Sequence, residues 1–119
     1  STLKDAQPGE SSAVMRERVM RARKIQEQRF AEYNQTAKSP VHCNAQMTPK
    51  LVREYCLLDA QGDKLLSYAM DKMGLSARAY DRILKVARTI ADLDNSTNIL
   101  VKHISEAISY RSLDREDWI

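Results

Sequence analysis

The chain has 119 residues, 43% hydrophobic and 29% charged, and its 19 basic and 16 acidic residues leave a net charge of +3, too small to indicate nucleic-acid binding by itself. Its length suits one modest core, no apolar run approaches the roughly 18 residues of a membrane span, and no signal peptide is recognisable at the N-terminus. The three glycines, Gly9, Gly62 and Gly74, cannot form the G-x-x-x-x-G-K-[ST] loop that holds nucleotide phosphates, nor a G-x-G-x-x-G turn.

Residues 1–9 are mostly polar, include a Pro-Gly pair and predict a flexible tail. The stretch 10–37 contains neither glycine nor proline and predicts a long basic helix capped by Ser11 or Ser12. Gln26 and Arg29 interrupt its thin apolar stripe. The apolar positions are Met15, Val19, Ala22, Phe30 and Tyr33. Such a helix is weakly stable alone, so we expect it to dock on the rest of the chain or on a partner.

Residues 38–47 contain Pro40 and predict a linker loop, after which the range 48–112 predicts a bundle of about four helices. The first of these begins with Thr48 as the capping hydroxyl and Pro49 at the first helical position. Its apolar face carries Leu51, Tyr55 and Leu58.

The second bundle helix is predicted over residues 60–73, with Asp59 as its N-cap and Gly74 as a left-handed C-cap. Its apolar positions are Leu66, Ala69, Met70 and Met73. Gly62, in its first turn, has no explanation in the sequence.

The third bundle helix, capped by Ser76, has the strongest helical periodicity in the chain. Its apolar positions are Tyr80, Ile83, Leu84, Ala87, Ile90 and Ala91. Residues 94–96 end it, and a last helix ends near Arg111. The apolar positions of that helix are Leu100, Ile104, Ala107 and Ile108. Residues 113–119, which include Trp118, predict a short C-terminal tail, and the absence of useful period-2 alternation predicts an all-α fold.

The cysteines and histidines predict neither a metal site nor an activated nucleophile. His42, Cys43, Cys56 and His103 lack C-x-x-C and H-x-x-x-H spacing, whereas a closed metal site needs about four ligands. Two cysteines without a disulfide framework indicate a reducing compartment, so we expect the cytoplasm.

Three bases share the polar face of the third bundle helix. Arg78, Arg82 and Lys85 are spaced by four and three residues. Arg78 lies in the first turn, where the helix dipole favours an anion rather than a cation. A residue that goes against such a local preference can mark a functional site. These bases are either solvated side chains or contacts to a phosphate, a nucleotide or a nucleic-acid backbone.

The bases of the first helix allow the same two interpretations. Glu17 and Glu27 partly balance them, and binding to a duplex requires several bases that converge on phosphates. The candidate interface residues of this helix are Arg18, Arg21 and Arg29.

Four segments carry a family resemblance: ESSAVMRERVMRARKIQEQRF at 10–30, CNAQM at 43–47, LSARAYDRILKVARTIADL at 75–93 and HISEAISYRSLDR at 103–115. In this order they resemble the C-terminal parts of magnesium-chelatase-like AAA+ ATPases of the ComM type, and the segment at 75–93 is the most specific. The resemblance implies a helical AAA+ lid whose ATPase core is absent. Residues 10–37 would then join the lid to that core, and the fragment itself would not be an enzyme.

The resemblance places Arg78 at the second-sensor position, where an arginine reaches the terminal phosphates of ATP bound by the core or by a neighbouring subunit. A guanidinium stays charged and forks toward phosphate oxygens, which suits that role. Arg82 is a candidate auxiliary contact.

For the full-length parent the resemblance implies ATP and Mg2+ as cofactors, a hexameric ring of subunits as partners, and DNA processing by branch migration during competence. The fragment is expected to hold no cofactor. The alternative is a free-standing helical module that binds nucleic acid, or an acidic protein partner, through the basic face of the third bundle helix.

Overall fold

The computed structural model describes residues 10–113, and it describes side chains from 12 to 110. The elements in chain order are α2 (Glu10–Thr36), the 3-10 turn η1 (Asn44–Gln46), α3 (Pro49–Tyr55), α4 (Ala60–Met73), α5 (Ala77–Leu93) and α6 (Val101–Leu113). The predicted all-α fold, a long helix followed by a bundle, is confirmed for this range. The tail predicted at 1–9 lies outside it, and of the tail predicted at 113–119 only Leu113 is described, as the last residue of α6.

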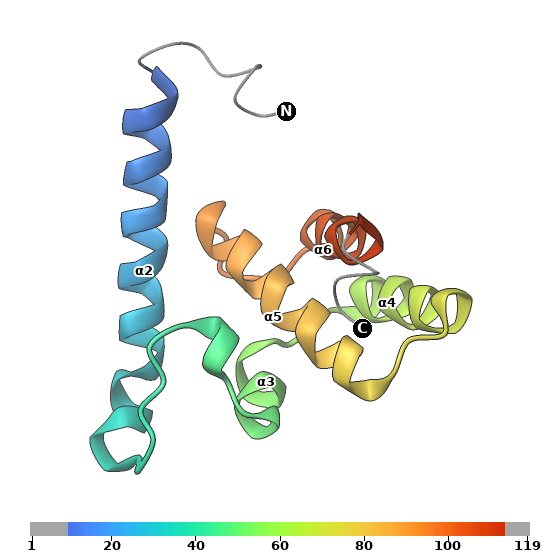
Figure 1. Cartoon of the computed structure of the whole chain (residues 1–119), viewed down its shortest axis with the longest axis horizontal. Helices are drawn as coiled ribbons and strands as arrows, with labels where there is room; N and C mark the ends of the chain where they lie inside the picture. Colours follow the sequence, from blue (N-terminus) through green and yellow to red (C-terminus); the bar gives the residue numbers. More distant parts are fainter. Residues whose placement is uncertain (1–9, 114–119) are drawn as a thin grey trace.

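The helix with the strongest periodicity, α5, lies at the centre of the fold. It contacts α2, α3, α6 and η1, while α4 packs against α6. In Figure 1, α2 stands upright beside the bundle that the other helices form. The buried positions of α5 are Ala79, Ile83, Leu84, Ala87, Arg88, Ala91 and Asp92. Two of these are charged, which the apolar periodicity did not indicate.

Capping chemistry sets the starts of α3, α4 and α5 as predicted, whereas α2 begins at Glu10, so the prediction of Ser11 or Ser12 as its N-cap is wrong. Thr48, Asp59 and Ser76 have extended backbones, and each side chain accepts a hydrogen bond from the backbone N–H three residues later. Gly74 follows α4 with φ +61° and ψ +41°, the left-handed C-cap expected there. These boundaries depend on contacts within one helical turn, which is why local sequence was sufficient.

Two predicted apolar positions lie outside the helices. Leu58, expected on the face of α3, comes after that helix ends at Tyr55 and pairs with Ile99 in an isolated parallel bridge. Leu100, expected in the last helix, precedes α6 and is 39% exposed.

The two ends of α2 differ in how far their apolar side chains are buried against the bundle. Ala22 and Phe30 are buried, and the Phe30 ring meets Tyr55 edge to face with centroids 5.7 Å apart. Met15 and Val19, predicted to continue the same stripe, are 48% and 40% exposed. Docking of the apolar stripe of α2 is therefore confirmed from Ala22 onward; before Ala22, Arg18 reaches the carbonyl oxygen of Leu93 but the stripe is exposed.

A close approach of α4 to α6 explains Gly62. A Cβ atom at this position would lie 2.7 Å from Cδ1 of Ile104, whose side chain is fully buried. Glycine is the residue that permits this separation of the two helices.

Gly62→Ala is expected to lower the free energy of unfolding by about 1 kcal/mol, because overpacking a core contact costs roughly 1–3 kcal/mol and outweighs the gain of about 1 kcal/mol in helix propensity. Urea unfolding followed by circular dichroism measures the change. In an Ile104→Val background, which removes Cδ1, the same substitution is expected to be neutral or stabilising. An equal loss in both backgrounds would show that the Cδ1 contact is not the cause.

Candidate functional site: the arginines of α2 and α5

Arg78 is the second residue of α5 and is exposed. The left-handed Gly74 ends α4 and Ser76 caps α5, so a short turn separates the two helices and leaves Arg78 at the surface. Among the described side chains, Arg78 makes no hydrogen bond or ion pair. Its guanidinium donors are therefore available to an anion supplied by another molecule or another part of a longer chain.

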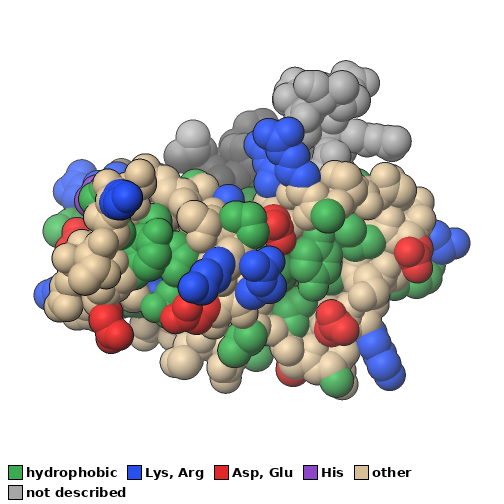
Figure 2. Space-filling model, turned by 90° about the horizontal axis from the view of Figure 1, so that it is seen from below, with side chains coloured by type: hydrophobic (Ala, Val, Ile, Leu, Met, Phe, Trp, Pro, Cys, Tyr) green, Lys and Arg blue, Asp and Glu red, His purple; other side chains and the backbone are tan. Residues whose placement is uncertain are grey.

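The three bases predicted to share a face of α5 have different surroundings. Arg82 is exposed like Arg78, whereas Lys85 is half-buried and its Nζ donates to the carbonyl oxygen of Ala45 in η1 at 3.3 Å. On the face of the molecule in Figure 2, basic side chains gather near the middle, with acidic side chains beside them. The surface seen there is of mixed charge rather than uniformly basic.

Arg29 forms a buried ion pair within the chain. Its Nη1 and Nη2 donate to the two carboxylate oxygens of Asp92 at 2.8 and 2.7 Å, and the two side chains are 11% and 0% exposed. Arg88, one turn before Asp92 on α5, donates from Nε to Asp92 Oδ1 at 3.2 Å. Its Nη1 and Nη2 donate to the carbonyl oxygens of Thr97 and Ser96 at 2.9 and 2.7 Å.

Asn44 brings η1 into the same network. Its Nδ2 donates to Asp92 Oδ2 at 2.8 Å, and its Oδ1 accepts from Arg29 Nη1 at 2.9 Å. Its backbone N–H donates to Gln26 Oε1 at 3.0 Å, and Gln26 is itself buried. We call this network the polar clamp; its residues are Gln26, Arg29, Asn44, Arg88 and Asp92.

The polar clamp was not foreseen from the sequence. Gln26 and Arg29 are polar, but they lie on the same side of α2 as its buried apolar residues and pack against the bundle. Asn44 is buried where a plain linker loop was expected. The usable signal was the helical spacing of Gln26 and Arg29 with Ala22 and Phe30, which places them toward the bundle.

The clamp is charged as well as buried. Burial raises the pKa of Asp92, but hydrogen bonds from Arg29 and Asn44 and the charges of Arg29 and Arg88 outweigh that effect, so the pKa lies below its ordinary value. Burial lowers the pKa of Arg88, and the charge of Asp92 opposes this. Because arginine stays protonated in proteins, two guanidinium cations share one carboxylate.

Comparison with known proteins shows the family to which this chain belongs. The family described as magnesium chelatase, subunit ChlI C-terminal, matches residues 9–111. The chain belongs to this family. The match covers every arginine described above, and hence both Arg78 and the whole of the polar clamp.

Several relatives in this family align over nearly the whole chain. Protein YifB of Escherichia coli K12, which is uncharacterized, is 43% identical over 108 residues, which cover 91% of this chain and 19% of that protein. Competence protein ComM of Haemophilus influenzae is 40% identical over 107 residues, covering 90% of this chain and 19% of ComM. This member of the family therefore spans about a fifth of the length of the relatives it matches.

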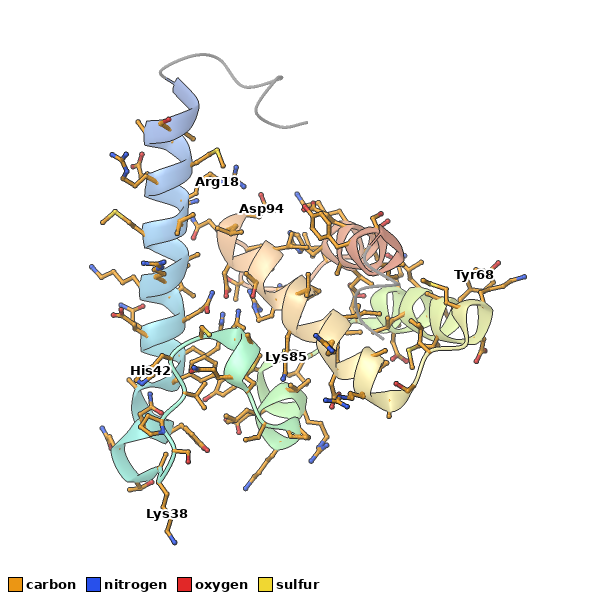
Figure 3. All side chains as sticks on the ribbon, viewed as in Figure 1. Arg18, Lys38, His42, Tyr68, Lys85 and Asp94 are labelled. Atoms are coloured by element: carbon orange, nitrogen blue, oxygen red, sulfur yellow. The ribbon has the colours of Figure 1, made fainter. Side chains whose placement is uncertain are left out.

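The other candidate interface residues of α2 lie apart from the clamp. Arg18 donates from Nε to the carbonyl oxygen of Leu93 at 3.3 Å, at the end of α5. It lines a pocket of about 480 Å³ between α2, α5 and α6, whose walls also include Lys85 and Asp94 (Figure 3). Arg21 is exposed, whereas Arg29 is paired with Asp92 inside the clamp. The structure therefore does not bring Arg18, Arg21 and Arg29 together at one surface.

No group of histidines, cysteines and acids suited to a metal ion occurs among the described residues. His103 is buried; its Nδ1 accepts from the Leu100 N–H at 2.9 Å, which leaves the proton on Nε2 to bond Asp94 Oδ2 at 2.9 Å. Burial raises the pKa of the Cys56 thiol to about 11, so it is protonated and unreactive near neutral pH. None of the helices in the described range is long and apolar enough to cross a membrane.

Proposed function

We propose that this chain is the C-terminal lid of a magnesium-chelatase-like AAA+ ATPase of the ComM type, and that it senses ATP bound by the core. Membership of the magnesium chelatase family supports the class of protein. The observation that carries the sensing role is the exposed Arg78 at the first turn of α5, with no acceptor among the described side chains. A guanidinium in this position has its donors free for the terminal phosphates of a nucleotide.

The polar clamp supports a mechanism for coupling. Arg78 stands at the start of α5, while Arg88 and Asp92 stand near its end, where Arg29 ties α5 to α2. In our proposal α2 connects the lid to the core. A contact between Arg78 and the phosphates fixes the position of α5, and because the clamp joins α5 to α2, the position of α2 is fixed as well. Loss of the γ-phosphate releases Arg78 and lets the lid turn against the core.

The parent protein, in this proposal, binds ATP with Mg2+, assembles as a hexameric ring in the cytoplasm and acts in DNA processing. Neighbouring subunits and the core are the partners of the lid, and DNA is a partner of the parent. The name of one relative, competence protein ComM, supports a role in DNA processing for the parent. The lid alone carries no catalytic residue, and Arg82 is an auxiliary contact to the nucleotide.

The isolated chain is expected to hydrolyse no ATP and to bind it weakly, because the proposal assigns the phosphate loop and the metal ligands to the core. Release of inorganic phosphate and the anisotropy of a fluorescent ATP analogue measure the two properties, with the full-length parent as the positive control. Robust hydrolysis by the isolated chain would refute the lid assignment.

The alternative, a module that binds nucleic acid through the basic face of α5, is less well supported, because Lys85 is directed to Ala45 of η1. Titration of a labelled DNA duplex at two salt concentrations separates the two functions. Submicromolar binding by the isolated chain that weakens steeply with salt would favour the alternative.

A further inference from the structure

A second pocket of about 480 Å³ opens between α2, the end of α3 and the loop before α6. Arg29 and Arg88 of the polar clamp both line it. The apolar part of its wall is formed by Ile25, Leu57 and Ile99. It therefore combines two buried cations with a hydrophobic wall, and it lies apart from Arg78.

The clamp does not use all the donors of its two arginines. The three hydrogen bonds of Arg29 leave from Nη1 and Nη2, so its Nε–H has no acceptor among the described residues. Arg88 donates from Nη1 to one carbonyl oxygen, which leaves the second hydrogen of Nη1 unused within the same range. Both side chains are nearly buried, at 11% and 6% exposed, and unpaired charged donors are costly at such positions.

The charges around the pocket favour a ligand with one negative charge. Asp92 balances only one of the two guanidiniums. Glu54, the acid that lines the pocket, is exposed and forms no ion pair with either arginine. The buried groups alone, two guanidiniums and Asp92, therefore carry one excess positive charge, which a monoanion balances; a dianion exceeds that balance.

We propose that this pocket binds the side chain of an aspartate or glutamate presented by a partner protein segment. The carboxylate accepts from the unused donors of Arg29 and Arg88, and such hydrogen bonds between two charged groups are stronger than those between neutral ones. The methylene groups of the partner's side chain lie against the apolar wall. Leu57, 71% exposed in this structure, becomes covered by the same segment. This inference does not depend on Arg78 or on nucleotide sensing.

The test follows the arginine Nε–H resonances of the chain by NMR at constant ionic strength. The probes are a capped Ala-Glu-Ala peptide, its Ala-Gln-Ala counterpart and sodium phosphate. We expect a saturable shift of the Arg29 Nε–H resonance with the glutamate peptide, no saturable shift with the glutamine peptide, and weaker binding of phosphate. Equal shifts with the two peptides, absence of saturation with the glutamate peptide, or tighter binding of phosphate would overturn the proposal.

Variants of surface acids test the same site without disturbing the clamp. Glu54→Gln removes the negative charge beside the pocket, so it is expected to tighten binding of the glutamate peptide about two- to fivefold. Glu27→Gln removes one charge from an exposed position of α2 that does not line the pocket, and it is expected to leave the affinity within about twofold. Identical affinities for the two variants would place the peptide elsewhere on the molecule and contradict the assignment.

Discussion

Replacing Asp92 with alanine is expected to lower the free energy of unfolding by about 3–5 kcal/mol, the usual cost of removing one partner from a buried ion pair. The Asp92 carboxylate accepts hydrogen bonds from Arg29, Arg88 and Asn44. Without it, two guanidiniums remain buried together and repel each other, and the side-chain amide of Asn44 loses an acceptor. Urea unfolding followed by far-ultraviolet circular dichroism measures the loss.

Asp71 provides the matched control. It is an exposed acid on α4 with no ion pair among the described residues, so Asp71→Ala is expected to change the free energy of unfolding by less than about 0.5 kcal/mol. A triple variant, Arg29→Met with Arg88→Met and Asp92→Leu, is expected to be more stable than Asp92→Ala, because it leaves no buried charge unpaired. A loss for Asp92→Ala as small as that for Asp71→Ala would mean that the clamp adds little to stability.

The contribution of Asp92 is also expected to depend on pH. Its folded pKa lies below the unfolded value of about 3.9, so folding favours the ionised carboxylate. The resulting stability is fully present above the unfolded pKa and is lost as the pH falls through the folded one. The difference in unfolding free energy between the unmodified chain and Asp92→Ala should therefore be constant near neutral pH and shrink below about pH 4.

Arg78→Ala in the full-length parent is expected to lower kcat for ATP hydrolysis about 10²- to 10³-fold, the range for losing one charged or polar group that stabilises the transition state. The side chain is exposed and makes no described contact, so the fold of the lid should not change. Arg78→Lys keeps the charge but loses the forked donors, and an intermediate rate is expected. Steady-state phosphate release at saturating ATP measures the effect.

Arg53 is the control for this substitution. It is an exposed base in the last turn of α3, and it makes no hydrogen bond or ion pair with a described side chain. Arg53→Ala is expected to leave kcat within about twofold, since a surface charge far from the reacting atoms has a small, screened effect. If Arg78→Ala lost no more activity than Arg53→Ala, Arg78 would have no role in hydrolysis.

The parts of the fold that were predictable from sequence are those decided within a turn or two of helix. Thr48, Asp59, Ser76 and Gly74 each fix a boundary through hydrogen bonds to residues close in the chain. Gly62 remained unexplained because Ile104, the residue that crowds it, lies on another helix. The exposure of Met15 and Val19 was likewise invisible, because periodicity shows which face of α2 they share but not how far the bundle extends along it.

The candidate site divides in the same way. Arg78 was found through its spacing and a family resemblance, and the structure adds that its guanidinium is exposed; the sensing role stays a prediction. The pairing of Arg29 with Asp92 joins residues 63 positions apart, and nothing local to either one indicates the other. Sequence alone therefore predicts Arg29 as a surface base, because a charged residue on a basic helix is usually solvated.

A structure of the full-length parent with Mg2+ and a non-hydrolysable ATP analogue tests the central claim most directly. We expect the Arg78 guanidinium to lie about 2.7–3.2 Å from an oxygen of the γ-phosphate, in the same subunit or in its neighbour. An Arg78 side chain directed into solvent in every subunit, with other residues occupying the γ-phosphate oxygens, would contradict the assignment of this chain as an ATP-sensing lid.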